Sequence, residues 1–260
     1  MKVSVLNLVP LRHGESFKDA MDAMVRLAKR VEDLGYTRYW IAEHHNMRSI
    51  ASSATQLLIQ HTLANTKKIR VGSGGVMLPN HSPYLIAEQY GTLETLYPNR
   101  VDLGLGRAPG TDVPTAMALR RTKDLKTDFE RDLAELSGYF KGSNYVQAYP
   151  AHGLYLPFYI LGSSTDSAYL AAKLGLPYSF AAHFAPTMME NAIAIYNRYF
   201  QPSATLDKPY VILGVNAILA DTDEEAKRLS TTMIQSFLNI VTSNQKGLMP
   251  PLQSEEAVWR

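Results

Sequence analysis

The stretch at residues 16–42, SFKDAMDAMVRLAKRVEDLGYTRYWIA, contains a helix pattern followed directly by a strand pattern. In its first half, apolar residues recur every three or four positions, which is typical of an amphipathic helix. Ser16 and Asp19 have the spacing of a capping box, and Gly35 provides the stop. The apolar run 39–42 has the composition of a buried strand. A helix followed by a fully apolar strand predicts a parallel sheet covered by helices, an α/β fold.

The same alternation continues along the chain. Strand patterns are expected at residues 3–9, 39–42, 69–78, 101–105, 158–161, 178–181 and 210–219. Helix patterns are expected at residues 16–34, 54–65, 84–96, 125–140, 167–174 and 186–200, with a further helix that Asp221 or Thr222 would cap.

A chain of 260 residues allows one large domain, 1–260. The alternation alone leaves two architectures open, an open doubly wound sheet and a closed (β/α)8 TIM barrel. About 250 residues is the usual barrel size, which favours the barrel. Only seven strands are counted, because the tail GLMPPLQSEEAVWR has two prolines and no strand pattern, so the eighth βα unit is expected to be absent. The long connection 107–156 is expected to be a specificity insertion.

Composition narrows the classes of function. The net charge is +2 and no dense Lys/Arg run occurs, so the sequence does not suggest binding to nucleic acid or to an anionic membrane. The chain has no cysteine, which excludes disulfides, thiolate ligands and a cysteine nucleophile. No signal peptide or membrane span is evident, and a cytoplasmic location is expected.

In a barrel, the residues after each strand converge on one mouth. This rule collects Asn7, Glu43, His44, His45, Gly74, Gly75, Arg107, Ser163, Ser164, Ala182 and His183. For the motif EHH (43–45), three interpretations stay open: acid/base or hydrogen-bonding groups for a ligand, metal ligands, or ordinary loop polarity. Successive strand residues point to opposite faces, so His44 and His45 are poorly placed to chelate one ion together, and no metal is expected.

Three further motifs are ambiguous when taken singly. The run VGSGGVMLP (71–79) has glycines inside a strand, which indicates either a bulge or a flat ligand against the bare backbone of Gly74 and Gly75. Arg107, in LGLGRAPG, suits a phosphate but could bridge loop carbonyls instead. The turn LGSST, with Ser163 and Ser164, could bind an anion at a helix start or merely cap that helix.

Together these motifs resemble the bacterial luciferase-like flavin monooxygenase family. The resemblance runs in order from MKVSVLNLVP through RYWIAEHHN, IASSAT, VGSGGVMLPNHSP, AEQYGTLETLYPNRVDLGLGRAPGTD and YILGSSTDSAYLAAKLGLPYSFA. It implies a TIM barrel, and a homodimer joined through the helices at 54–65 and 84–96. It also implies that the chain uses reduced FMN, supplied by a separate flavin reductase, and O2 to oxygenate a small organic substrate through a flavin C4a-peroxide.

The resemblance also assigns roles to residues. His44 matches the histidine needed for activity in luciferase, and Glu43 and His45 match its neighbours. Gly74 and Gly75 match a small pair joined by a non-proline cis peptide beneath the flavin ring. Arg107 and Ser163 match phosphate-binding positions, and Ser164 is the second serine of that turn. This sequence has Gly106 where luciferase has a reactive cysteine, and Asp166 where it has a phosphate-loop threonine.

Three rival functions remain open at this point. A deazaflavin (F420)-dependent hydride transferase would share the barrel and the phosphate site without using O2. A non-catalytic flavin-binding protein would match a short chain, although the EHH motif and the 107–156 insertion argue against it. A metal-dependent barrel hydrolase is the third.

Overall fold

The computed structural model describes residues 1–124, 126–242, 244 and 246–259. Seven strands form one sheet, and every neighbouring pair is parallel. They are β1 (Ser4–Asn7), β2 (Arg38–Ile41), β3 (Arg70–Met77), β4 (Val101–Gly106), β5 (Phe158–Gly162), β6 (Tyr178–Phe180) and β7 (Val211–Leu213). The strands lie in sequence order, β1 to β7, whereas a doubly wound sheet would reverse its order at a switch point. The sheet curls into an incomplete barrel, and the described residues contain no eighth strand.

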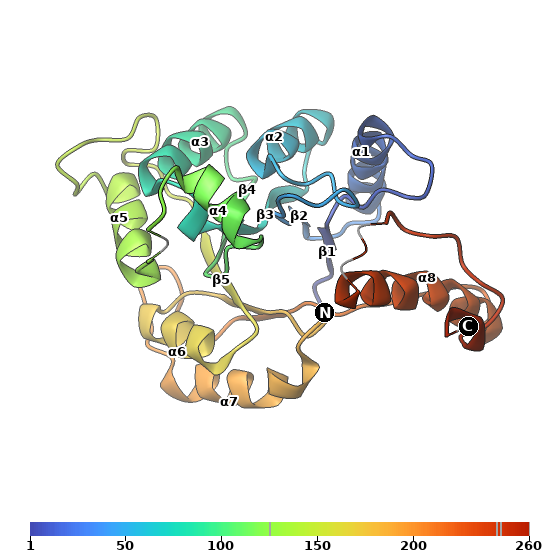
Figure 1. The fold of residues 1–260 in the computed structure, drawn as a ribbon. Helices are drawn as coiled ribbons and strands as arrows, with labels where there is room; N and C mark the ends of the chain where they lie inside the picture. The colour runs from blue at the N-terminus through green and yellow to red at the C-terminus, as the bar shows by residue number, and fades with distance from the viewer. Residues whose placement is uncertain (125, 243, 245, 260) are drawn as a thin grey trace.

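Helices surround the outside of the strands (Figure 1). The α-helices are α1 (Phe17–Asp33), α2 (Thr55–Asn65), α3 (Pro83–Leu96), α4 (Val113–Arg120), α5 (Phe129–Lys141), α6 (Thr165–Leu174), α7 (Met189–Tyr199) and α8 (Asp223–Val241). Short 3-10 turns are η1 (Leu78–Asn80), η2 (Pro186–Met188) and η3 (Glu256–Val258). Among the described residues, every helix is too short or too polar to cross a lipid bilayer.

The sequence-based prediction of α1 is confirmed at both ends. The Ser16 side chain accepts the backbone N–H of Asp19, and the Asp19 carboxylate accepts the backbone N–H of Ser16. Thr222 caps α8 through the N–H of Glu225, which selects one of the two predicted caps. These caps satisfy backbone donors that a helix start leaves without partners.

Several elements differ from expectation in their presence or their bounds. Helix α4 was not anticipated; Asp112 caps it by accepting the N–H of Thr115. The seventh strand stops at Leu213 rather than residue 219; the amide of Gly214 still donates to the Phe180 carbonyl of β6, and within the described chain the ladder goes no further. Residue 125, the expected start of the next helix, lies outside the described residues, and α5 begins at Phe129.

Each strand has one face toward the helices and one toward the barrel interior. In β2, the Tyr39 hydroxyl donates to the carbonyl of Met24 on α1, so Tyr39 lies on the helix side. The next residue, Trp40, points inward, where its indole N–H donates to Asp102 of β4. Buried aliphatic and aromatic side chains from β2, β3 and β4 pack beneath α1 to α3 and form the core. This packing fixes the strand ends that carry the candidate site.

Candidate active site

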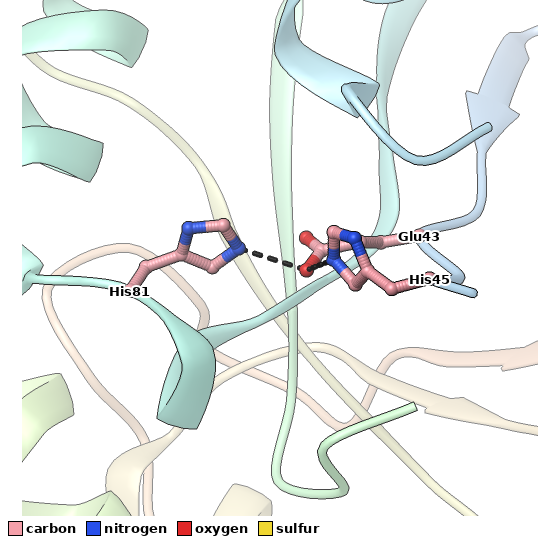
Figure 2. A group of neighbouring side chains, drawn as sticks. All are labelled: Glu43, His45 and His81. Atoms are coloured by element: carbon pink, nitrogen blue, oxygen red, sulfur yellow. Dashed lines mark hydrogen bonds and ion pairs between the residues drawn. The ribbon is translucent and has the colours of Figure 1, made fainter. Parts of the chain in front are cut away.

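A buried carboxylate, Glu43, lies just beyond the end of β2. Its side chain is 0% exposed, and one oxygen, Oε1, accepts hydrogen bonds from His45 Nε2 at 2.9 Å and His81 Nε2 at 2.8 Å. The other oxygen, Oε2, accepts the backbone N–H of Met77 at 3.2 Å. Figure 2 shows the two imidazole rings approaching the carboxylate from different segments of the chain. Glu43 therefore joins the loop after β2 to the end of β3 and to the segment that leads into α3.

Burial opposes ionisation of Glu43, but the hydrogen bonds from His45, His81 and the Met77 amide outweigh it and lower the pKa to about 2. The carboxylate is consequently charged at neutral pH. A buried charge of this kind is tolerated only when its acceptor sites are filled, as they are here.

His81 is the member of this cluster that sequence reasoning missed. It follows η1 and stands 38 positions from Glu43, and no spacing motif connects the two residues. The only signal was its position just beyond the end of β3, where a barrel places functional side chains.

The three donor and acceptor atoms of Glu43, His45 and His81 lie within 4.8 Å of one another, a grouping that could hold a metal ion. The separations of 2.8 and 2.9 Å are those of N–H···O hydrogen bonds, in which a proton occupies each contact. Ligands around a zinc ion at about 2.0–2.2 Å stand farther apart, at roughly 3.3 Å. Hydrogen bonds therefore account for the distances between Glu43, His45 and His81. His44 takes no part in this cluster.

His44 occupies a different environment from its two neighbours. Its backbone N–H donates to the carbonyl of Ser52 at 3.0 Å, which fixes the main chain there. Its Nδ1 atom is buried and has no hydrogen-bond partner among the described residues. Burial lowers the pKa of His44 below 6.5, although the nearby charge of Glu43 opposes this change. His44 is therefore neutral at pH 7 and can accept a proton.

The glycine pair lies on β3, beside the strand that leads to His44. The peptide bond between Gly74 and Gly75 is cis, as the resemblance implied. The pairing of β3 with β4 shifts between Ser73 and Val76, so both glycines face a single residue, Gly104, as in a bulge.

The glycines also allow close packing. A Cβ on Gly75 would stand 2.8 Å from the carbonyl oxygen of Gly104, and one on Gly74 would stand 2.6 Å from a methyl carbon of Leu6. The bulge, one of the two alternatives from sequence, is confirmed, and the other, a flat ligand against this backbone, stays a prediction.

The expected phosphate-binding residues lie at the ends of β4 and β5. Ser164 caps α6, and its Oγ accepts the N–H of Ser167 at a long 3.5 Å. Arg107 follows β4 and reaches across to Asp166, in the first turn of α6, with 3.6 Å between guanidinium nitrogen and carboxylate oxygen. Both of these side chains are more than half exposed. The structure thus places a cation beside the helix start, with an acidic group next to it.

The remaining residues of the mouth have structural contacts. Asn7 accepts the N–H of Val9 at 2.7 Å. His183 Nδ1 lies 3.3 Å from the carbonyl of Gly214, and Asn216 donates to the His183 carbonyl at 2.9 Å. Ala182 is half-buried and offers no polar side chain.

A second polar cluster, which no sequence motif predicted, lies inside the barrel near the start of the strands. Asp102 accepts hydrogen bonds from Arg38 and Trp40, both at 3.0 Å, and from Arg70 at 2.7 Å. Arg38 also donates to the hydroxyls of Tyr159 and Tyr210. The cluster connects strands β2, β3, β4 and β5 and the residue before β7.

Comparison with known proteins agrees with this geometry. A family model described as luciferase-like monooxygenase matches residues 1–259. The chain belongs to the luciferase-like monooxygenase family. A protein of that same name from Escherichia coli K12 is 49% identical over 260 residues, covering 98% of this chain and 78% of the relative. The Bacillus subtilis protein YvbT is 53% identical over 265 residues, covering 99% of this chain and 78% of its own.

Solved structures support the barrel fold of this luciferase-like chain. The crystal structure of apo-MsnO8 matches with a TM-score of 0.91 at 34% identity, covering 99% of this chain and 76% of that one. The oxygenating constituent of 3,6-diketocamphane monooxygenase from Pseudomonas putida, solved with FMN, has a TM-score of 0.74. At 19% identity, and with 94% of this chain and 75% of that chain covered, this second match shows the fold alone. The predicted family and the predicted TIM-barrel fold are both confirmed.

Proposed function

We propose that this luciferase-like protein is a flavin-dependent monooxygenase that uses reduced FMN and O2 to oxygenate a small organic substrate. The observation that carries the proposal is the buried, unpartnered Nδ1 of His44, which stands beyond β2 while the bare Gly74–Gly75 backbone lies on the adjacent strand. The pairing of Ile41 with Ser73 holds the two segments side by side. When bound, the reduced flavin would supply the electrons that activate O2.

The residues present fit such a cofactor. The flat Gly74–Gly75 segment would support the ring, and the amides at the start of α6 with Ser163, Ser164 and Arg107 would hold the phosphate. Asp166 is unfavourable beside a phosphate, but its pairing with Arg107 shows that it can direct its charge toward that cation.

His44 is the candidate catalytic residue in this proposal. Because it is neutral at pH 7, it could accept a proton at the flavin edge or at the substrate. Glu43 and His45 were also expected to be catalytic. Glu43 is hydrogen-bonded to both His45 and His81, so we assign Glu43 and His45 a positioning role. The apolar walls and the 107–156 insertion would exclude water.

FMN is preferred to a deazaflavin because curated relatives at 34% identity or more include proteins named as monooxygenases. One of them is the N-acetyl-S-alkylcysteine monooxygenase of Bacillus subtilis, at 34% identity over 238 residues. An F420-dependent tetrahydromethanopterin reductase from Methanopyrus kandleri shares the fold at 15% identity and a TM-score of 0.63, so hydride transfer is the second candidate.

The proposal keeps three further expectations. A separate reductase would supply reduced FMN, and the protein would act in the cytoplasm. Helices α2 and α3 would join two copies into a homodimer, which is supported by three exposed leucines on them, Leu57, Leu85 and Leu96. Light scattering on the purified chain would measure the mass of the assembly.

The test is anaerobic binding of photoreduced FMN, followed by rapid mixing with oxygenated buffer while the flavin spectrum is recorded. A monooxygenase should return to oxidised flavin at least tenfold more slowly than free reduced FMN. His44→Ala should bind FMN normally but lose most oxygenation activity, about 10²-fold for loss of a general base. The wild-type rate should also fall as the pH drops through the pKa of His44, which burial holds below the ordinary histidine value, because His44 becomes protonated there.

His13→Ala, at an exposed position in the loop before α1, is the matched control and should behave as wild type. Oxidation as fast as that of the free flavin would contradict the proposal. Reduction of bound F420 in place of FMN would favour the hydride-transfer function.

A further inference from the structure

The ends of β6 and β7 show which side of the sheet the ring of His183 occupies. The hydroxyl of Tyr178 in β6 lies 2.9 Å from a serine hydroxyl of α6, so Tyr178 faces the helices, and so does its pairing partner in β7, Val211. Gly214 continues this ladder, because its amide donates to the Phe180 carbonyl at 2.9 Å. Side chains alternate along a strand, so Gly214, three residues after Val211, faces the barrel interior.

The His183 ring fills the place that a side chain on Gly214 would take. A Cβ added to Gly214 would stand 2.7 Å from His183 Nδ1 and 3.1 Å from its Cε1. The Asn216 side chain donates to the His183 carbonyl at 2.9 Å, which fixes the main chain there. The Phe184 ring packs edge to face against the imidazole, with ring centroids 4.7 Å apart. The imidazole is therefore held at the mouth, on the inner side of the sheet.

One nitrogen of this ring is available to a ligand. Nδ1 lies 3.3 Å from the Gly214 carbonyl, and a carbonyl oxygen only accepts, so Nδ1 carries the proton and Nε2 of the neutral ring is an acceptor. Burial lowers the pKa of His183 below 6.5, and the hydrogen bond to Gly214 raises it by less, so the ring is neutral at pH 7. Within the described part of the chain Nε2 has no hydrogen-bond partner, and it is not a fully buried atom.

His183 and His44 follow strands on opposite sides of the mouth. Their strands, β6 and β2, are four places apart in the sheet order, which is half the circumference of an eight-stranded barrel. A substrate that approaches His44 from within the mouth therefore has its other end toward His183.

We propose that His183 Nε2 binds the substrate by accepting a hydrogen bond from its hydroxyl group, and that the substrate is a phenol. The Phe184 ring is 60% exposed, so it offers an aromatic surface to the phenol ring beside Nε2. A carboxylate is disfavoured, because an unprotonated Nε2 has neither a proton nor a positive charge to offer it. This inference rests on the proposed function, because it names the substrate class of that site.

The probes are 4-ethylphenol, its methyl ether 4-ethylanisole and 4-ethylbenzoate, measured by calorimetry on the full chain with and without reduced FMN. The wild type should bind the phenol about 3–10-fold more tightly than the ether, which is the contribution of one hydrogen bond. The benzoate should bind no better than the ether.

Two substitutions separate the roles of the two ring nitrogens. His183→Asn keeps an amide N–H in reach of the Gly214 carbonyl but has no atom at the position of Nε2, so it should keep the melting temperature and lose the preference for the phenol. His183→Gln places an amide oxygen near the position of Nε2 without the bond to Gly214, so it should melt earlier and keep part of the preference. His13→Asn, at an exposed position, is the control and should keep both properties.

A preference for the phenol that survives in His183→Asn would overturn the proposal, because His183 would then serve only to hold Gly214. Equal binding of phenol and ether, tighter binding of the benzoate, or no binding of any probe at millimolar concentration would overturn it as well. The expected pattern in a chain that fails to bind reduced FMN would instead remove the proposed function and leave the hydroxyl-binding role of His183 in place.

Discussion

A single side chain, Glu43, organises the candidate site. Its carboxylate has no contact with solvent, yet it accepts hydrogen bonds from His45, His81 and the Met77 amide. These donors come from two segments, the loop after β2 and the stretch from the end of β3 through η1, which meet only in the folded state. We therefore expect the charge on Glu43 to stabilise the conformation of the loop that carries His44.

The first prediction follows from the pKa of Glu43. The folded value is about 2 and the ordinary value is 4.5, so the stabilisation is present above pH 4.5 and is lost as the pH falls toward 2. Glu43→Gln should reduce the free energy of unfolding at pH 7 by about 3–5 kcal/mol, as expected when one partner of a buried charged cluster is lost. It should also flatten the dependence of the unfolding free energy on pH between 4.5 and about 2. Urea unfolding at several pH values measures both effects.

Glu190→Gln, on the exposed surface of α7, is the control and should keep the wild-type pH dependence. An unchanged unfolding free energy in Glu43→Gln would mean that the charge does not hold the loop.

For single residues, the sequence pattern predicted which side chains follow strands but not which side chains they would hydrogen-bond. The position of Glu43 and His44 after an apolar run was enough to mark both. The contact between His81 and Glu43 depends on how η1 follows β3, which periodicity does not encode. The same holds for Asn80 Oδ1, whose lack of a partner becomes visible only once the surrounding loops are folded.

Among the elements, β3 is the most constrained. It contains three glycines, and its pairing with β4 contains the bulge at Gly74 and Gly75. Backbone from the neighbouring strand approaches so closely that side chains have no room at several of these positions.

The bulge leads to the second prediction, which compares two single methyl additions. In Gly75→Ala the new Cβ meets a backbone oxygen of Gly104, which cannot move without disturbing β4. In Gly74→Ala its nearest neighbour is the end of the Leu6 side chain, which can rotate. Gly75→Ala should therefore lower the melting temperature more than Gly74→Ala does. Overpacking should cost Gly75→Ala about 1–3 kcal/mol in the free energy of unfolding. A larger loss in Gly74→Ala would contradict the packing described here.

The element boundaries show why prediction succeeded in some places. Helix α1 has a long apolar stripe and two capping signals, and its expected range 16–34 differs little from Phe17–Asp33. Helix α4 has eight residues, a proline and a single buried side chain, so it lacks a readable stripe. The last strand was overestimated because apolar residues continue past Leu213, and composition cannot reveal where pairing stops.

At the scale of the whole molecule, Asp102 connects several strands through polar contacts inside the barrel. It pairs with Arg38 and Arg70 while accepting the indole N–H of Trp40, so strands distant in sequence share one buried charge cluster. A buried charge network of this kind is costly to break, because removing one member leaves the others uncompensated.

The third prediction concerns this cluster. Asp102→Asn should lower the free energy of unfolding by about 3–5 kcal/mol and alter the fluorescence of Trp40. Asp207→Asn, on the exposed surface, should leave both unchanged. Chemical unfolding followed by tryptophan emission makes the comparison in one experiment. A stable Asp102→Asn variant with wild-type emission would show that the cluster is dispensable.

The order of the strands has an evolutionary consequence. Each strand pairs with the strands next to it in sequence, and β4 meets β5 in a fixed register that pairs Leu103 with Phe158. The intervening chain from Arg107 onward contributes nothing to that ladder, but its helix α5 buries side chains in the core and packs against α3. The freedom to vary in length is therefore confined to the stretch before α5, which can diverge while the barrel and its covering helices stay the same.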